Sequence, residues 1–266
     1  MEILSETQKC LGDISYMIEE YCFYNKLYPG QKEIFYNMQQ NKNVLICKSR
    51  DIGYTHLMAA LNACKMALNA ELKNDKEYRM VYFAQNYAMF QRFKQIVYQY
   101  LIQIPNFLYK TKNIKTSIKI NSTYENKLGM LTIGNYTLEY ININNFNINK
   151  CKHLYDNIII EQVIYDEPVT LNNNCDINLS YEFFKDKSKK IIIGGNGNHK
   201  NEKWFKFCKK LKNEEYPIVS IGWFTNPNHT SYYLNQLSSM LKTNDGEDNF
   251  EDEFGAKIFH YEKTFL

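Results

Sequence analysis

Apolar residues recur along the chain with two different periods, which predict alternating helices and strands. Residues 8–24 and 31–40 carry apolar side chains at the three-to-four spacing of amphipathic helices, and Pro29-Gly30 separates the two segments. A short apolar run at 43–47 is followed by a polar turn and by a helical pattern that extends to Leu68. A predicted strand at 79–84 and a predicted helix at 86–103 come next. This order predicts two successive units of strand, loop and helix.

Further strands are predicted in the middle and at the end of the chain. Segments 114–120, 128–133 and 136–143 have the composition of short strands joined by turns, and they predict a β-meander insertion. Apolar runs at 158–165, 190–193 and 217–223 predict three more strands, and helices are expected at 202–211 and 231–241. The repeated alternation favours an α/β fold with a mainly parallel central sheet flanked by helices on both faces. Such sheets bind ligands at the carboxyl ends of their strands.

Composition and charge restrict the class of protein. The 266 residues are 44% hydrophobic and 15% aromatic, which is enough apolar side chain to fill a sizeable core and excludes disorder as a description of the whole. No run approaches the roughly 18 consecutive apolar residues that span a bilayer, and the N-terminus lacks the features of a signal peptide. We therefore expect a soluble, intracellular protein with no membrane contact. The net charge of +3 does not by itself argue for nucleic-acid binding.

Length and cysteine spacing bound the organisation of the chain. We expect an N-terminal helical segment at 1–30 and a single domain at 31–266. The seven cysteines form no CxxC pair, so neither a disulfide framework nor a zinc site is predicted, and most of the thiols should be buried. The five histidines form no metal-binding spacing either.

The loop after the strand at 43–47 matches a phosphate-binding loop in part. On the pattern GxxxxGK[ST], Gly53 and Thr55 fit, whereas Lys48 takes the first glycine position and Tyr54 takes the lysine position. Backbone N–H groups and a helix N-terminus could still cradle phosphates, Thr55 could ligate Mg²⁺, and the Lys48 ammonium could enter from the other end of the loop. The alternative is an ordinary polar connection in which Thr55 caps the helix.

Two further strand ends carry groups that suit nucleotide chemistry. Asp166 and Glu167 follow the strand at 158–165, so one carboxylate could hold Mg²⁺ and its neighbour could polarise an attacking water. Taken alone, the pair could equally be a solvated turn. After the strand at 190–193, Gly195 allows close backbone approach, and Asn196 or Asn198 could sense a γ-phosphate. The alternative here is a flexible glycine turn.

Tyr28 and Gln31 lie just before the first predicted strand. From there an aromatic ring could stack on adenine, and an amide could read the edge of the base. Gln31 would otherwise be an exposed residue in the first turn of a helix.

In this order the motifs resemble those of the ATPase domain of the large terminase subunit, the DNA-packaging motor of tailed bacteriophages. The resemblance extends from about residue 28 to residue 254. Tyr28-Pro-Gly-Gln31 resembles that family's glutamine motif, and Cys47 to Thr55 resembles a deviant Walker A loop whose lysine has moved to the start. Segments 223–227 and 250–254 resemble those that close the domain in many terminases. Gly194 to Gly197, in contrast, lack the Ser or Thr and Pro of the family's coupling motif.

The resemblance implies a P-loop NTPase fold of the additional-strand type, with ATP and Mg²⁺ as cofactors. Glu167, Arg50 and Lys48 are then the catalytic groups, Arg50 contacts the γ-phosphate, and Thr55 and Asp166, the first acid of the Walker B pair, hold the metal. Gly195 and Asn196 stand at the coupling or sensor position. The implied nucleotide-binding residues are Tyr28, Gln31, Lys48, Ser49, Arg50, Asp51, Ile52, Gly53, Tyr54, Thr55 and His56, of which His56 packs or caps rather than catalyses.

The implied activity is ATP-driven translocation of double-stranded DNA through a portal protein into a procapsid. The expected partners are the portal, the procapsid, the small terminase subunit and neighbouring copies in a homo-oligomeric ring, and the isolated chain is expected to be a monomer. The expected location is the host-cell cytoplasm. No nuclease domain is expected in this chain, because an RNase H-like fold would need on the order of 150 further residues.

Two other functions fit the same residues. One is a helicase-like P-loop DNA translocase, and the other is a non-hydrolysing nucleotide-binding scaffold, which Tyr54 and the glycine-rich third motif favour. A row of lysines on the predicted helix at 202–211 is a candidate phosphate-tracking or partner face, and its alternative is a solvated helix face. These lysines are Lys203, Lys206, Lys209 and Lys210.

Overall fold

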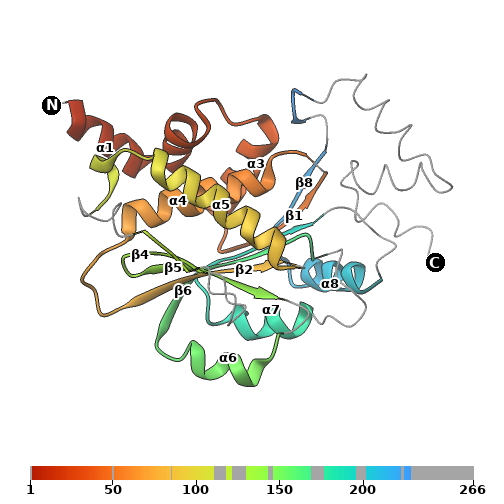
Figure 1. Cartoon of the computed structure of the whole chain (residues 1–266). Coiled ribbons are helices and arrows are strands. Elements are labelled where there is room, and N and C mark those ends of the chain that lie inside the picture. The colour runs from red at the N-terminus through yellow and green to blue at the C-terminus, as the bar shows by residue number, and fades with distance from the viewer. Residues whose placement is uncertain are drawn as a thin grey trace.

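One eight-stranded sheet organises the part of the chain that the computed structural model describes, and helices cover both of its faces (Figure 1). The described residues are 2–49, 51–84, 86–110, 118–121, 130–142, 146–168, 177–195, 202–222 and 225–228. The strands follow the order β3-β4-β5-β2-β6-β7-β1-β8 across the sheet. Their bounds are β1 Asn43–Lys48, β2 Glu77–Ala84, β3 Lys119–Asn121, β4 Met130–Ile133, β5 Tyr136–Asn142, β6 Ile158–Asp166, β7 Ile191–Gly195 and β8 Ile218–Ile221.

The sheet is parallel over most of its width. Strands β5, β2, β6, β7, β1 and β8 run parallel, whereas β3 and β4 pair antiparallel at the β5 edge. The predicted parallel sheet with a meander insertion is therefore confirmed, although residues 114–117 of the strand predicted at 114–120 lie outside the described residues. Strand β7 lies between β1 and β6, so one additional strand separates the two strands that carry the phosphate loop and the carboxylate pair.

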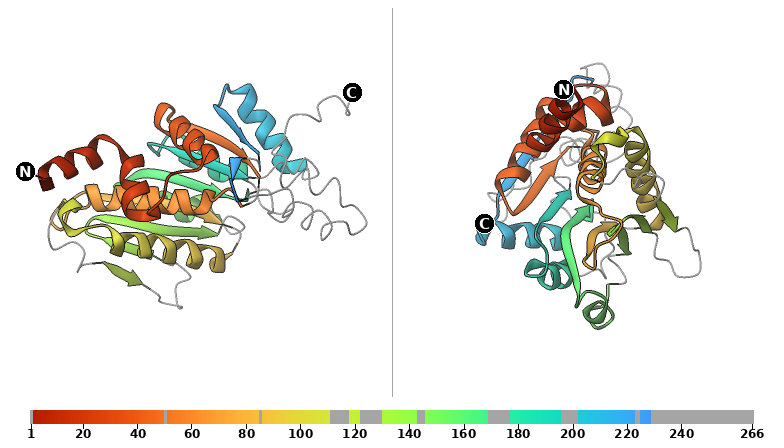
Figure 2. Two further views of the ribbon diagram at one scale, coloured as in Figure 1. Left: turned by 90° about the horizontal axis from the view of Figure 1, so that it is seen from above. Right: turned by 90° about the vertical axis from the view of Figure 1, so that its left-hand side faces the viewer.

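Two sets of helices sandwich the sheet. Helices α3 (Pro29–Gln40), α4 (Tyr54–Asn69) and α5 (Tyr87–Gln103) pack on one face, and α6 (Ile148–Leu154), α7 (Ile177–Lys185) and α8 (Glu202–Asn213) pack on the other (Figures 1 and 2). Successive strand residues alternate between the two apolar cores: Tyr82 of β2 belongs to the α4 and α5 side, and Phe83 belongs to the α7 and α8 side. This alternation decides which strand side chains can reach the phosphate loop.

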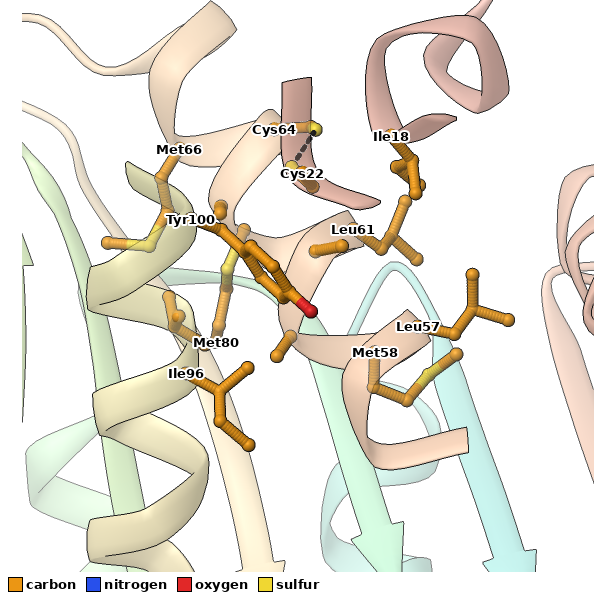
Figure 3. Packing of buried hydrophobic residues seen from close by; sticks show 14 of the residues in the cluster. Ile18, Cys22, Leu57, Met58, Leu61, Cys64, Met66, Met80, Ile96 and Tyr100 are labelled. Carbon is orange, nitrogen blue, oxygen red and sulfur yellow. Dashed lines mark hydrogen bonds between the residues drawn. The ribbon is translucent and has the colours of Figure 1, made fainter. Parts of the chain in front are cut away.

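The N-terminal segment contains three short helices, so the prediction of one helix over 8–24 is wrong. Helix α1 (Glu2–Gly12) ends before Asp13, whose carboxylate accepts hydrogen bonds from the backbone N–H groups of Ser15 (2.8 Å) and Tyr16 (3.3 Å) and so caps α2 (Ile14–Met17). A π-helical turn, η1 (Ile18–Phe23), follows. Figure 3 shows Cys22 of this turn beside Cys64 of α4, with the two sulfurs 3.7 Å apart.

Other sequence expectations hold with shifted limits. The helix predicted at 31–40 begins at Pro29, and the strand predicted at 217–223 is described from Ile218 to Ile221. Helices α6 and α7 and the 3₁₀ turn η2 (Asn106–Leu108) were not predicted. The six described cysteines are buried and form no disulfide with one another. No helix among the described residues is long and apolar enough to cross a membrane, and the helix predicted at 231–241 lies outside them.

Candidate nucleotide site

A cavity of about 570 Å³ lies where the carboxyl ends of β1 and β6 meet the first turn of α4. It brings together most of the site residues predicted from the loops after these two strands. Those that line it are Lys48, Ser49, Asp51, Ile52, Gly53, Tyr54, Thr55, His56, Asp166 and Glu167. The other predicted residues lie elsewhere: Tyr28, Gln31 and Gly195 are outside this lining, and Arg50 and Asn196 fall outside the described residues.

The loop between β1 and α4 owes its shape to two left-handed residues. Asp51 has a φ of 58° and Gly53 a φ of 76°. The positive φ at position 53 favours glycine, and a Cβ there would also lie less than 3.0 Å from Gln31 Nε2, so the Gln31 amide would have to move. Helix α4 begins at Tyr54 with Gly53 as its N-cap. The alternative in which Thr55 caps the helix is therefore wrong, and the Thr55 hydroxyl instead donates to the Asp166 carboxylate.

Lys48 and Glu167 form an ion pair across the cavity. The Lys48 side chain is buried, and its ammonium lies 5.2 Å from the centre of the Tyr54 ring, within cation–π range. Glu167 has a φ of 52°, and its N–H donates to the Gly194 carbonyl at 2.9 Å, which fixes the chain just after β6. A cation and a carboxylate from two different strands therefore face the same space.

Asp166 is the most enclosed acid of the cavity. Its Oδ2 accepts hydrogen bonds from the Tyr82 hydroxyl at 2.5 Å and from the Thr55 hydroxyl at 3.3 Å. Its side chain is 4% exposed, so the alternative of a solvated turn is wrong for this residue. Burial raises the pKa of Asp166, and the nearby Lys48 ammonium acts in the opposite direction.

The oxygens around Asp166 suit a magnesium ion. Asp166 Oδ1 is buried and has no hydrogen-bond partner in the described part of the chain, while the Thr55 hydroxyl lies beside the other carboxylate oxygen. Mg²⁺ prefers carboxylate, hydroxyl and phosphate oxygens. A buried carboxylate oxygen without a hydrogen-bond donor is a fitting ligand, and Thr55 and Asp166 are the residues that could hold the ion.

Tyr54 fills the position where a phosphate loop usually has its lysine, and it contributes packing instead of charge. The side chain is 2% exposed, and its ring lies against Gly194, where any side chain would collide with it. Burial raises the pKa of its hydroxyl well above the usual value. Gly195, the next residue, faces Trp204 of α8 on the opposite side of the sheet.

A second set of contacts holds the loop from the β8 side. Gln31 is buried, so the alternative of an exposed first-turn residue is wrong. Its Oε1 accepts a hydrogen bond from the Tyr28 N–H at 3.0 Å, and its Nε2 approaches the Gly53 carbonyl at 3.5 Å. Beyond β8, Asn226 Nδ2 donates to the Asp51 carbonyl at 2.6 Å, and Asn228 Nδ2 donates to the Tyr28 hydroxyl at 2.8 Å. The turn at 225–228 thus connects the phosphate loop with the glutamine segment.

Several residues of the site are absent from the sequence prediction. Tyr82 and three residues of α5, Met89, Arg92 and Ile96, complete the cavity lining. They lie inside a correctly predicted strand and helix, where no motif distinguishes them from their neighbours. His56 packs on α5 as well: its Nδ1 lies 2.8 Å from the Tyr100 hydroxyl, and burial and the Arg92 charge lower its pKa.

The lysines of α8 form a solvent-facing row. Lys203, Lys206 and Lys209 are exposed, whereas Trp204 on the same helix is buried. Lys210 pairs with Glu182 of α7 at 2.5 Å. A phosphate-tracking role for this row stays a prediction.

Solved structures share this fold. The large terminase of thermophilic bacteriophage D6E in complex with ADP matches 87% of this chain and 53% of its own, with 11% identity and a TM-score of 0.54. The ATPase domain of the Thermus phage P74-26 large terminase matches 90% of this chain and 96% of its own, with 10% identity and a TM-score of 0.51. The bacteriophage HK97 large terminase matches 95% and 53%, with 14% identity and a TM-score of 0.51.

These similarities show that the chain has the P-loop NTPase fold of large terminase ATPase domains. The chain spans about half the length of the D6E and HK97 large terminases. No protein-family model matches the sequence, and no curated protein sequence matches it either.

Proposed function

We propose that this chain is a magnesium-dependent ATPase and acts as the motor domain of a DNA-packaging machine. The observation that carries the proposal is that four residues line one cavity: Lys48 from the end of β1, Thr55 from the first turn of α4, and Asp166 and Glu167 from the end of β6. The fold supports it, and structures of the D6E large terminase hold ADP or ATP-gamma-S.

Each charged group has a distinct part in hydrolysis. Thr55 and Asp166 would hold Mg²⁺, which when bound would neutralise charge on the β- and γ-phosphate oxygens. Lys48 and Arg50 would stabilise the transferring phosphoryl group, and Glu167 would orient the attacking water. In this assignment Lys48 replaces the lysine that Tyr54 displaces.

The ion pair of Lys48 with Glu167 suggests how binding prepares the site. An incoming γ-phosphate is anionic like the Glu167 carboxylate, so it attracts the same Lys48 ammonium. When the ammonium moves towards the phosphate, the Glu167 carboxylate becomes available to a water molecule. Nucleotide binding would then assemble the catalytic arrangement.

The wider assembly follows from the same proposal. The substrate would be double-stranded DNA, moved through a portal protein into a procapsid in the host-cell cytoplasm. The chain would act with a small terminase subunit and as a ring of identical copies, one of which would supply a further cation to its neighbour's site.

Phosphate release tests the hydrolytic part of the proposal. We expect ATP hydrolysis that requires Mg²⁺, increases with double-stranded DNA in the presence of portal and procapsid, and disappears in Lys48→Ala. Protection of DNA from added nuclease inside procapsids then tests packaging. Nucleotide binding without turnover under all these conditions would support the scaffold, and ATP-dependent strand separation without packaging would support a helicase-like translocase.

A further inference from the structure

Tyr82 of β2 makes the shortest hydrogen bond to the carboxylate that is expected to hold the metal. Its hydroxyl donates to Asp166 Oδ2 at 2.5 Å, whereas the Thr55 hydroxyl donates to the same oxygen at 3.3 Å. Asp166 Oδ1 has no hydrogen-bond partner among the described residues. One carboxylate oxygen is therefore held by the protein, and the other remains available to a cation.

The Tyr82 ring is itself fixed. It is 1% exposed and stacks on Phe93 of α5, with ring centroids 4.0 Å apart and planes at 16°. The ring of Phe90, one turn earlier on α5, lies 6.1 Å away. Strand β2 is paired on both sides, with β5 and β6, so its backbone cannot shift independently. The hydroxyl is consequently presented to Asp166 from a rigid support.

We propose that Tyr82 is a positioning residue that orients the Asp166 carboxylate for Mg²⁺ binding. This inference rests on the proposed nucleotide site. A carboxylate at a strand end can rotate about two side-chain bonds, and a donor on one oxygen selects the rotamer that leaves the other oxygen free. Residues that orient a metal ligand in this way change metal affinity by about 10-fold to 100-fold when they are removed. If the Thr55 hydroxyl also binds the metal, its hydrogen bond to Asp166 is lost when Mg²⁺ is present. Tyr82 would then be the hydroxyl that still donates to this carboxylate.

Tyr82→Phe tests the proposal, because it removes one oxygen atom and keeps the ring that stacks on Phe93. Tyr165→Phe is a closely matched control. Tyr165 precedes Asp166 in β6, stacks on Phe83 at 4.6 Å, and donates its hydroxyl to Ser180 Oγ at 3.2 Å in the opposite core. Both variants lose a buried tyrosine hydroxyl, but only one loses a contact with the carboxylate.

The experiment titrates the ADP-saturated protein with Mn²⁺ and measures the free ion by electron paramagnetic resonance. We expect Tyr82→Phe to weaken Mn²⁺ binding about tenfold, with unchanged affinity for ADP in EDTA, and Tyr165→Phe to match the wild type. Equal Mn²⁺ affinity in all three proteins would overturn the role of Tyr82. A wild-type protein that binds neither ADP nor Mn²⁺ would overturn the nucleotide site as well.

Melting curves in EDTA establish that the variants fold. If Tyr82→Phe does not fold, Tyr82→Met carries the same test, since methionine fills a buried aromatic site without a strong donor. A purely structural hydroxyl would lower the melting temperature without changing Mn²⁺ affinity, and that result would also overturn the proposal.

Discussion

The Lys48 ammonium pairs with the Glu167 carboxylate, although 119 residues separate them along the chain. Lys48 is the last residue of β1 and Glu167 directly follows β6, and these two strands lie on either side of β7 in the sheet. The pair places the lysine that we propose to contact phosphate beside the carboxylate that we propose to orient water. Under the proposed function, substitutions at the two residues should therefore affect nucleotide binding and hydrolysis in different ways.

Glu167→Gln should separate binding from hydrolysis. The amide keeps the size of the side chain but cannot activate water, and it frees the Lys48 ammonium for phosphate. We expect ATP hydrolysis to fall at least about 100-fold, while affinity for a non-hydrolysable ATP analogue stays equal or increases. Phosphate release and analogue titration measure the two effects. The control is Glu161→Gln, which removes a β6 carboxylate that pairs with Lys189 away from the site. Hydrolysis at the wild-type rate in Glu167→Gln would exclude Glu167 as the carboxylate that activates water.

Asn226→Ala should loosen the phosphate loop from the β8 side. The buried Asn226 amide holds the Asp51 carbonyl at 2.6 Å, and Asp51 has a left-handed backbone. Loss of this hydrogen bond, worth about 1 kcal/mol, should weaken nucleotide binding roughly fivefold to tenfold. Isothermal titration calorimetry with ADP and Mg²⁺ measures the change in nucleotide affinity. Asn69→Ala is the control, because Asn69 makes a comparable amide bond to the Lys65 carbonyl at the far end of α4. Equal losses in both variants would contradict a specific role for Asn226.

Gly194→Ala should destabilise the fold beneath the site. A methyl group at this position would lie less than 3.0 Å from Cζ of the buried Tyr54 ring, so the ring or the backbone would have to shift. Overpacking of this kind typically costs about 1–3 kcal/mol. Urea denaturation measures the free energy of unfolding. Gly12→Ala is the matched control, since nothing lies within 4 Å of the added carbon. A stability of Gly194→Ala equal to that of the wild type would show that Tyr54 can leave this position.

Lys65 should make stability rise with pH in the alkaline range. It donates to Gln162 at 2.7 Å, and burial, reinforced by the charge of Lys190, lowers its pKa from 10.5 to about 8. Between these two values the unfolded chain binds more protons than the folded one, so the free energy of unfolding increases as the pH rises. The increase is at most about 3 kcal/mol, from 2.5 pH units at 1.36 kcal/mol each.

The difference between the wild type and Lys65→Met isolates this contribution from other titrating groups. Urea unfolding from pH 7 to pH 10 should show the wild type gaining stability relative to Lys65→Met. Lys73→Met, at an exposed position, provides the reference for loss of a lysine charge. A difference that stays constant over this range would exclude a lowered pKa for Lys65.

The alternation of strands and helices could be predicted because it depends on local apolar periods. The breaks in the helix predicted at 8–24 could not be predicted, because Asp13 ends one helix and caps the next while the apolar pattern continues without interruption. Helix α6 has only seven residues, too few for a helical period to stand out from its polar surroundings.

The site also contains residues that could be predicted from the sequence and a residue that could not. Four site residues lie at or just after the ends of predicted strands, and the carboxyl ends of parallel strands meet at one edge of a sheet, so we could expect them to converge. These residues are Lys48, Thr55, Asp166 and Glu167. Tyr82 reaches Asp166 only because β2 pairs with β6 in a register that sets Tyr82 opposite Ile164. A contact that depends on the register of strands far apart in sequence leaves no local pattern.

Nucleotide binding through Lys48 is best tested by the thermal shift of the purified chain with a non-hydrolysable ATP analogue, with and without Mg²⁺. The same measurement is made on Lys48→Ala. Ligand binding stabilises the folded state by RT ln(1 + [L]/Kd), about 2.7 kcal/mol at a ligand concentration of 100 Kd. We expect a magnesium-dependent rise in melting temperature for the wild type and none for Lys48→Ala. An equal rise in both proteins would contradict the displaced lysine, and no rise in the wild type at millimolar analogue would contradict the nucleotide site itself.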